Sequence, residues 1–157
     1  DDLASRRDCQ PLRSNMGFSV GPFNITARSL CHPQGSLGFR IEAAGKSMCF
    51  ATDTEQRLED EIDPALMSLA KDVDLLIHDA QYTAAEYRGE LGPPRQGWGH
   101  STYVAACAAA EASGAKQLAL FHHDPTHDDG LMDALEADAR TYFTATRAAR
   151  EGLSVEL

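Results

Sequence analysis

Apolar and polar residues alternate in short runs through the first third of the chain. Alternation with a period of two is typical of β-strands that bury one face. It predicts three strands, at residues 23–30, 36–42 and 47–52. A turn around Gly45 separates the last two, so we expect them to form a hairpin. Residues 1–16 are polar and irregular, which indicates a linker or lead-in before a domain that spans residues 17–157.

Further along the chain the apolar residues take up helical spacing. This spacing predicts helices near residues 59–70, 102–113 and 128–150. Other apolar runs predict strands at residues 73–78, 117–121 and 153–157. Residues 80–99 are rich in Gly, Pro and aromatic residues, and we expect a long ordered loop of the kind that often carries function. The alternation of strands and helices indicates an α/β protein with a mixed sheet of about six strands and helices on one face.

Composition and charge narrow the choice of function. The 157 residues are 43% hydrophobic and 24% charged, which suits one globular domain. The formal charge of −10 argues against general binding to nucleic acids or to anionic membranes. It leaves room for a phosphate substrate, because bound metal ions reverse the sign locally.

The location that we expect is the cytoplasm, without membrane attachment. No run approaches the roughly 20 apolar residues of a membrane span, and the N-terminus has no secretory signal. The four cysteines, Cys9, Cys31, Cys49 and Cys107, form no Cys-x-x-Cys pair. Cys31, Cys49 and Cys107 lie in apolar patterns, so we expect buried, reduced thiols there.

Three histidines and an aspartate stand at the ends of apolar runs: His32, Asp53, His100 and His122. A strand end holds a side chain rigidly at the edge of a sheet, as a metal site requires. Imidazole and carboxylate groups suit zinc, manganese or iron. Each position also has an ordinary structural explanation, such as a solvent-facing loop histidine at His32 or an Asx turn at Asp53.

The order His, Asp, His, His in these contexts resembles the second half of a metallo-β-lactamase-fold hydrolase. The matching segments are residues 30–33, 51–54, 99–102 and 120–125. The resemblance is to the phosphodiesterase-type branch, which includes phosphoribosyl cyclic phosphodiesterase and ribonuclease Z, and it runs from about residue 18 to residue 157. It implies the second half of an αββα sandwich. The His-x-His-x-Asp-His motif of the family's first half is absent from the chain.

This resemblance implies two divalent metal ions, zinc or manganese, with iron as an alternative. His32 would bind one ion, His122 the other, and Asp53 would bridge both, which offsets the repulsion between two dications. We favour His122 over its neighbour His123 as the ligand. His123 or Asp124 would then orient a ligand without binding metal.

His100 is implied to contact the phosphate and to act as a general acid, for which its place at a helix N-terminus is suited. Asp79 matches a position at which the family often has an acid near the site, where it would support the ligands. The expected enzyme is a phosphodiesterase in which a hydroxide between the two metals attacks phosphorus. We expect a small phosphodiester or related ester as substrate. The alternative is a catalytically silent half-domain with a binding or regulatory role.

The missing half has a chemical and a physical consequence. Each metal ion would keep only two protein ligands, below the three usual in catalytic zinc sites. The apolar sheet face that the other half buries would be open. We therefore expect the chain to need the other half-domain, or a dimer partner, to cover the sheet.

Overall fold

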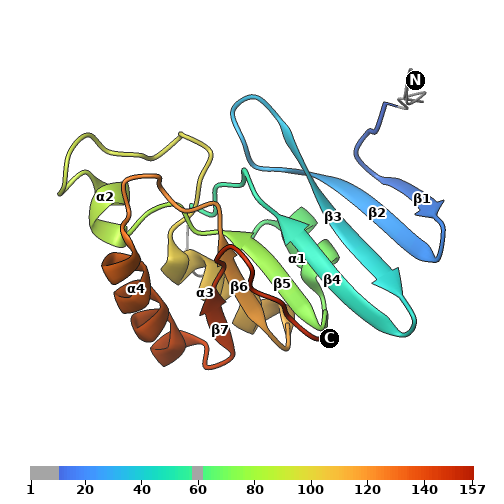
Figure 1. Cartoon of the computed structure of the whole chain (residues 1–157). Helices are drawn as coiled ribbons and strands as arrows, with labels where there is room; N and C mark the ends of the chain where they lie inside the picture. The colour runs from blue at the N-terminus through green and yellow to red at the C-terminus, as the bar shows by residue number, and fades with distance from the viewer. Residues whose placement is uncertain (1–10, 58–61) are drawn as a thin grey trace, which may run out of the picture.

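A computed structural model describes residues 11–57 and 62–157 of the chain. In this part it contains one seven-stranded sheet and four helices (Figure 1). The strands are β1 (Met16–Val20), β2 (Phe23–Leu30), β3 (Ser36–Ala43), β4 (Lys46–Ala51), β5 (Leu75–Asp79), β6 (Leu118–Phe121) and β7 (Thr146–Ala148). The helices are α1 (Pro64–Ala70), α2 (Ala84–Arg88), α3 (Tyr103–Ser113) and α4 (Asp129–Tyr142).

The strands lie in the sheet in the order in which they occur in the sequence. β1 to β4 are antiparallel, and β4 to β7 are parallel. The prediction of a mixed α/β sheet is therefore confirmed, and the three strands predicted from alternation are β2, β3 and β4. The edge strand β1 was not predicted, because its five residues stand directly beside the irregular lead-in. Residues 1–10 of that predicted lead-in lie outside the described part.

The helices cover one face of the sheet, as predicted. Figure 1 shows α1 and α3 behind the sheet, with α4 beside α3. α1 begins after its N-cap Asp63, which accepts a hydrogen bond from the backbone of Ala65. The first residues of the predicted 59–70 helix lie partly outside the described residues. α3 buries small side chains, mainly alanines, so its backbone can pack close to the sheet.

Two predictions near the C-terminus are wrong. The helix predicted for residues 128–150 ends at Tyr142, and β7 follows it. β7 pairs with β6 through Leu118 and Thr146, so sheet pairing overrides the local helical pattern. Residues 153–157 form no strand. The 80–99 loop also contains a helix, α2, which begins at a capping box that the sequence displays as Thr83 and Glu86.

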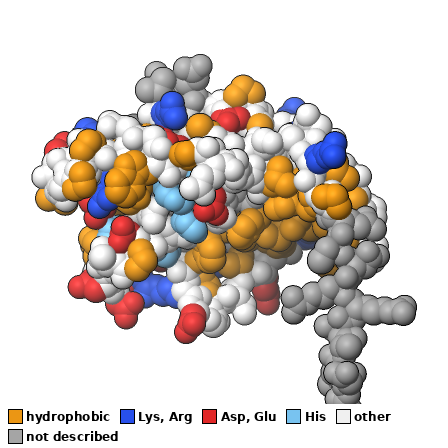
Figure 2. Space-filling view, turned by 90° about the horizontal axis from the view of Figure 1, so that it is seen from above, with side chains coloured by type: hydrophobic (Ala, Val, Ile, Leu, Met, Phe, Trp, Pro, Cys, Tyr) orange, Lys and Arg blue, Asp and Glu red, His pale blue; other side chains and the backbone are white. Residues whose placement is uncertain are grey.

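The sheet face opposite the helices is apolar and only partly covered: the segment after β7 crosses it (Figure 1), and Leu157 lines one pocket together with Ile41 and Met48. Cys49 on β4 packs in the core with α1 and α3, so its neighbour Phe50 points to the other side. Phe39 and Ile77 pair with Phe50 and share that face. The Phe121 ring lies 6.0 Å from the Phe50 ring and is 41% exposed. Figure 2 shows hydrophobic side chains gathered in a band beside the histidines.

Two expectations from composition concern thiols and membranes. Cys49 and Cys107 are buried free thiols, as expected, whereas Cys31 is a free thiol that is only half-buried. Cys9 lies outside the described part. Among the described residues, no helix combines the length and the hydrophobicity that crossing a membrane would take.

Candidate metal centre

The chemically suited side chains meet at one edge of the sheet. His32 follows β2, Asp53 follows β4 and His122 follows β6. These three strands run in the same direction, because β2 and β4 are both antiparallel to β3 and β6 is parallel to its neighbours. Their ends therefore reach the same edge. His100 comes from the segment that leads into α3, just before the N-cap Thr102.

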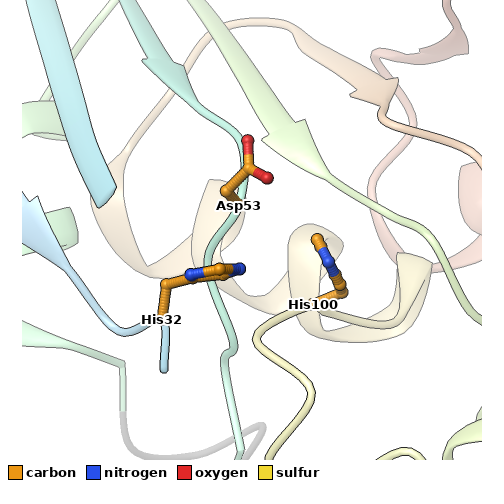
Figure 3. Close-up of side chains that lie close together, drawn as sticks. All are labelled: His32, Asp53 and His100. Atoms are coloured by element: carbon orange, nitrogen blue, oxygen red, sulfur yellow. The ribbon is translucent and has the colours of Figure 1, made fainter. Parts of the chain in front are cut away.

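Asp53 lies close to histidines from separate segments of the chain. One nitrogen of His32, one carboxylate oxygen of Asp53 and one nitrogen of His100 lie within 4.8 Å of one another. Figure 3 shows these three side chains arriving from three separate segments. Nε2 of His122 lies 3.6 Å from Oδ1 of Asp53, and the His122 ring stacks on the His100 ring at 4.9 Å. Asp79, His100 and His122 form a second group within the same 4.8 Å limit.

The donor set fits divalent transition metals. Neutral imidazole nitrogens and carboxylate oxygens bind zinc, manganese and iron at about 2.0–2.2 Å, so two ligands of one ion lie a few ångströms apart. The separations within both groups are in that range. The role of each residue as a ligand stays a prediction.

The backbone at two of these residues is in an uncommon conformation. Asp53 has φ 53° and His122 has φ 61°, in the left-handed region that most side chains avoid. Such a residue costs on the order of 1–3 kcal/mol and persists only where its surroundings hold it. In both cases the residue follows a strand, and the left-handed turn directs its side chain into the shared space.

Asp79 connects the segment of Asp53 with the segment of His100. Its fully buried carboxylate accepts hydrogen bonds from the backbone N–H groups of Asp53 (2.9 Å) and Ser101 (3.1 Å). The same carboxylate lies 2.8 Å from Nδ1 of His100. This hydrogen bond raises the pKa of His100 above its ordinary value. The sequence placed Asp79 near the site, and the structure places it directly behind His100 and Asp53.

Glu55 was missed by the sequence analysis. Its buried carboxylate accepts hydrogen bonds from the backbone N–H groups of Gly97 (2.8 Å) and Gly99 (3.1 Å) and from the Tyr87 hydroxyl (2.6 Å). These contacts fix the segment that carries His100. The glycines are 42 and 44 residues away in the sequence, so no local pattern could reveal the pairing.

His123 and Asp124 were expected to orient a ligand. Burial lowers the pKa of His123, which favours its neutral ring. Asp124 accepts hydrogen bonds from the backbone N–H and the hydroxyl of Thr126, and so caps its own loop. Of the adjacent histidines, His122 is the one whose ring joins the group around Asp53.

The backbone of Gly99 lies directly against the candidate ligand His32. A Cβ on Gly99 would lie 2.3 Å from Cδ2 of His32 and 2.6 Å from Cδ of Pro33, and the residue has φ +94°. We expect Gly99→Ala to displace His32 and to lower the free energy of unfolding by about 1–3 kcal/mol. Urea denaturation measures this loss.

The matched control is Gly97→Ala. Gly97 also has a positive φ, +84°, but its Cβ would meet no atom within 4 Å. This variant carries the backbone strain without the clash. Equal losses in the two variants would show that the contact with His32 is unimportant.

Comparison with protein families supports the resemblance seen in the sequence. The family model described as "Beta-lactamase superfamily domain" matches residues 2–123. A ribonuclease Z from Synechococcus sp. (strain CC9311) is 35% identical over 136 residues, which cover 85% of this chain and 37% of that protein. A ribonuclease Z from Brevibacillus brevis is 36% identical over 109 residues, covering 67% of this chain and 31% of that protein. The chain thus spans about a third of the length of these curated relatives.

Solved structures agree on the fold. The metallo-β-lactamase fold protein YhfI from Bacillus subtilis gives a TM-score of 0.73 at 22% identity, covering 90% of this chain and 52% of YhfI. Zn²⁺-bound PqqB from Methylobacterium extorquens gives 0.72 at 17% identity, covering 94% of this chain and 55% of PqqB. The short form of human tRNase Z gives 0.58 at 22% identity, covering 88% of this chain and 45% of that enzyme.

These relatives overturn one expectation. A small phosphodiester or ester substrate was expected, together with no general binding of nucleic acids. Curated relatives that match most of the chain include ribonuclease Z enzymes, and a structural neighbour is a tRNase. The net charge of −10 misled because it is a sum over the whole chain. Contact with a phosphate backbone depends on the local field of a site, to which bound ions and nearby arginines contribute.

Proposed function

Because the chain belongs to the beta-lactamase superfamily, we propose that it forms the second half of a metal-dependent phosphodiesterase that cleaves RNA. The observation that carries this proposal is the position of Asp53 within reach of both His32 and His122. A carboxylate so placed can bridge two ions, and two-metal sites are common among enzymes that hydrolyse phosphodiesters.

In this proposal His32, His122 and Asp53 would hold the metal ions, with Asp53 shared between them. The ions are zinc or manganese, with iron as the alternative, since all three accept this donor set. Bound ions would supply polarisation of the phosphoryl group and activation of water. The left-handed turns at Asp53 and His122 place both residues directly after their strands, where their side chains lie close together.

His100 supplies the proton for the leaving oxygen. With its Nδ1–H donated to Asp79, a protonated His100 ring presents its Nε2–H toward the shared space. Asp79 holds the ring in one orientation and stabilises its charge. The pKa of His100 is raised by this hydrogen bond, so more of its ring is protonated near neutral pH, as a general acid requires.

The exposed part of this apolar sheet face supports the need for a second half. Phe39, Phe50, Ile77 and Phe121 share this face, and burying them would contribute about 25 cal/mol for each Å² of apolar surface removed from water. We propose that a half carrying His-x-His-x-Asp-His packs there. That half would also raise the number of ligands on each ion above two.

The test uses the chain joined to the half that carries His-x-His-x-Asp-His. We expect metal-dependent cleavage of an RNA with an unpaired 3′ extension, followed on a denaturing gel. A chelator should abolish the cleavage, and added zinc or manganese should restore it. The DNA of the same sequence and a lactone serve as comparison substrates. Hydrolysis of the lactone with intact RNA would refute the proposal, and RNA binding without any cleavage would support the silent half-domain.

A further inference from the structure

A row of side chains leads outward from His100 along the 80–99 segment. The Tyr82 ring lies 6.2 Å from the His100 ring, edge to face. The guanidinium carbon of Arg95 lies 5.7 Å from the centroid of the Tyr82 ring and 4.4 Å from that of the Trp98 ring. We call Tyr82, Arg95 and Trp98 the aromatic ladder. Tyr82 is buried, whereas Trp98 is 50% exposed, so the ladder opens to solvent at its outer end.

The ladder is held in place by its backbone. The Arg95 N–H donates to the carbonyl of Tyr87, and the Trp98 N–H donates to the carbonyl of Arg95. Glu55 binds the N–H groups on both sides of Trp98, at Gly97 and Gly99. An exposed tryptophan fixed in this way loses little conformational freedom when it meets a ligand.

Arg95 brings positive charge to the centre in a strongly acidic chain. No ion pair joins it to a carboxylate in residues 11–57 and 62–157, although other arginines of the chain are paired in this way. Its guanidinium lies on one face of Trp98, where cation–π attraction orients both groups. Its N–H groups are suited to a phosphate, and arginine binds phosphate oxygens in a fixed, two-pronged geometry.

We propose that the aromatic ladder is a subsite for one unpaired RNA nucleotide next to the cleaved bond, with its base on Trp98 and its phosphate on Arg95. The inference rests on the proposed function, since it deepens the choice of substrate. Proteins bind single-stranded RNA by stacking bases on aromatic side chains and guanidinium planes. Trp98 is two residues from His100, so a base stacked there belongs to a nucleotide close to the leaving group.

The experiment compares variants of the joined protein on an RNA whose unpaired nucleotide at this place is 2-aminopurine. This fluorescent base loses intensity when it stacks. We expect Trp98→Ala to abolish the quenching and to raise KM about 5- to 150-fold with little change in kcat, because one base–aromatic stack carries a factor of that size. Trp98→Phe should restore most of the affinity. Leu91→Ala is the control, since Leu91 is 70% exposed in the same segment and outside the ladder.

A second part of the experiment uses an RNA that lacks the base at this nucleotide. An abasic nucleotide should weaken binding to the wild type as much as Trp98→Ala does, and the two changes together should add little. Additive effects, or equal KM values for Trp98→Ala and Leu91→Ala, would refute the ladder while leaving the ribonuclease proposal intact. If the wild type binds and stacks the 2-aminopurine without cleaving, the ladder stands and the proposed catalysis fails. If it neither binds nor cleaves the RNA, both fail.

Discussion

Asp53→Asn is expected to lower RNA turnover by about 10³-fold or more and to reduce the bound metal. This carboxylate lies within reach of both His32 and His122, so it can serve two ions. An amide carries no charge, so it cannot offset the repulsion between the dications, a contribution of several kcal/mol to the transition state. Asparagine tolerates the left-handed φ of 53° that this position requires, so the backbone should be preserved. Rate assays and elemental analysis of the purified protein measure the two effects.

The matched control is Asp72→Asn. Asp72 has nearly the same φ, 52°, but it is exposed and stands after α1. Its replacement should leave turnover and metal content unchanged. Full metal occupancy with full turnover in Asp53→Asn would remove Asp53 from the site.

His100→Ala is expected to lower kcat by about 10²–10⁴-fold, the size ascribed to general acid–base help. Metal content should stay near that of the wild type, because His32, Asp53 and His122 remain. A hydrogen bond to a carboxylate such as Asp79 is typical of a histidine that transfers protons, and equally of one that binds metal. The metal content of this variant therefore decides between the two roles.

Loss of metal from His100→Ala would make His100 a ligand and overturn the role of acid. A suitable control is His127→Gln, because the His127 ring bonds to Glu86 at 3.0 Å and glutamine can keep that contact. Turnover in this control should match the wild type. A comparable fall would indicate that general loss of structure explains the His100 result.

The sequence was most informative where patterns are local. Period-two alternation located β2, β3 and β4, because each exposes one face. The candidate ligands could be named because each follows an apolar run, and strand ends meet at one edge in this kind of sheet. The strand β7 was not predicted, because its residues continue a pattern that favours a long helix. Its pairing with β6 is a tertiary contact, which local patterns do not reveal. α2 was missed although its capping box is visible in the residues.

Other features of the centre could not be read from the residues. The left-handed backbone of Asp53 and His122 is imposed by packing, since neither residue type requires it. The role of Glu55 depends on glycines more than 40 residues away. Both belong to the arrangement of segments around the site, which short motifs do not encode.

The order of the strands affects how the chain acquires its structure. Each strand from β2 to β7 hydrogen-bonds to the strand before it in the sequence. A growing polypeptide can therefore add strands one by one to an existing edge, beginning with the β1–β4 meander, whose loop-closure costs are small. The strands β1 to β4 are synthesised before Asp53, so this meander can form first. His122 reaches its place only after β6 has joined the sheet. The candidate centre would then be completed late in folding, next to the β1–β4 meander, which is already ordered.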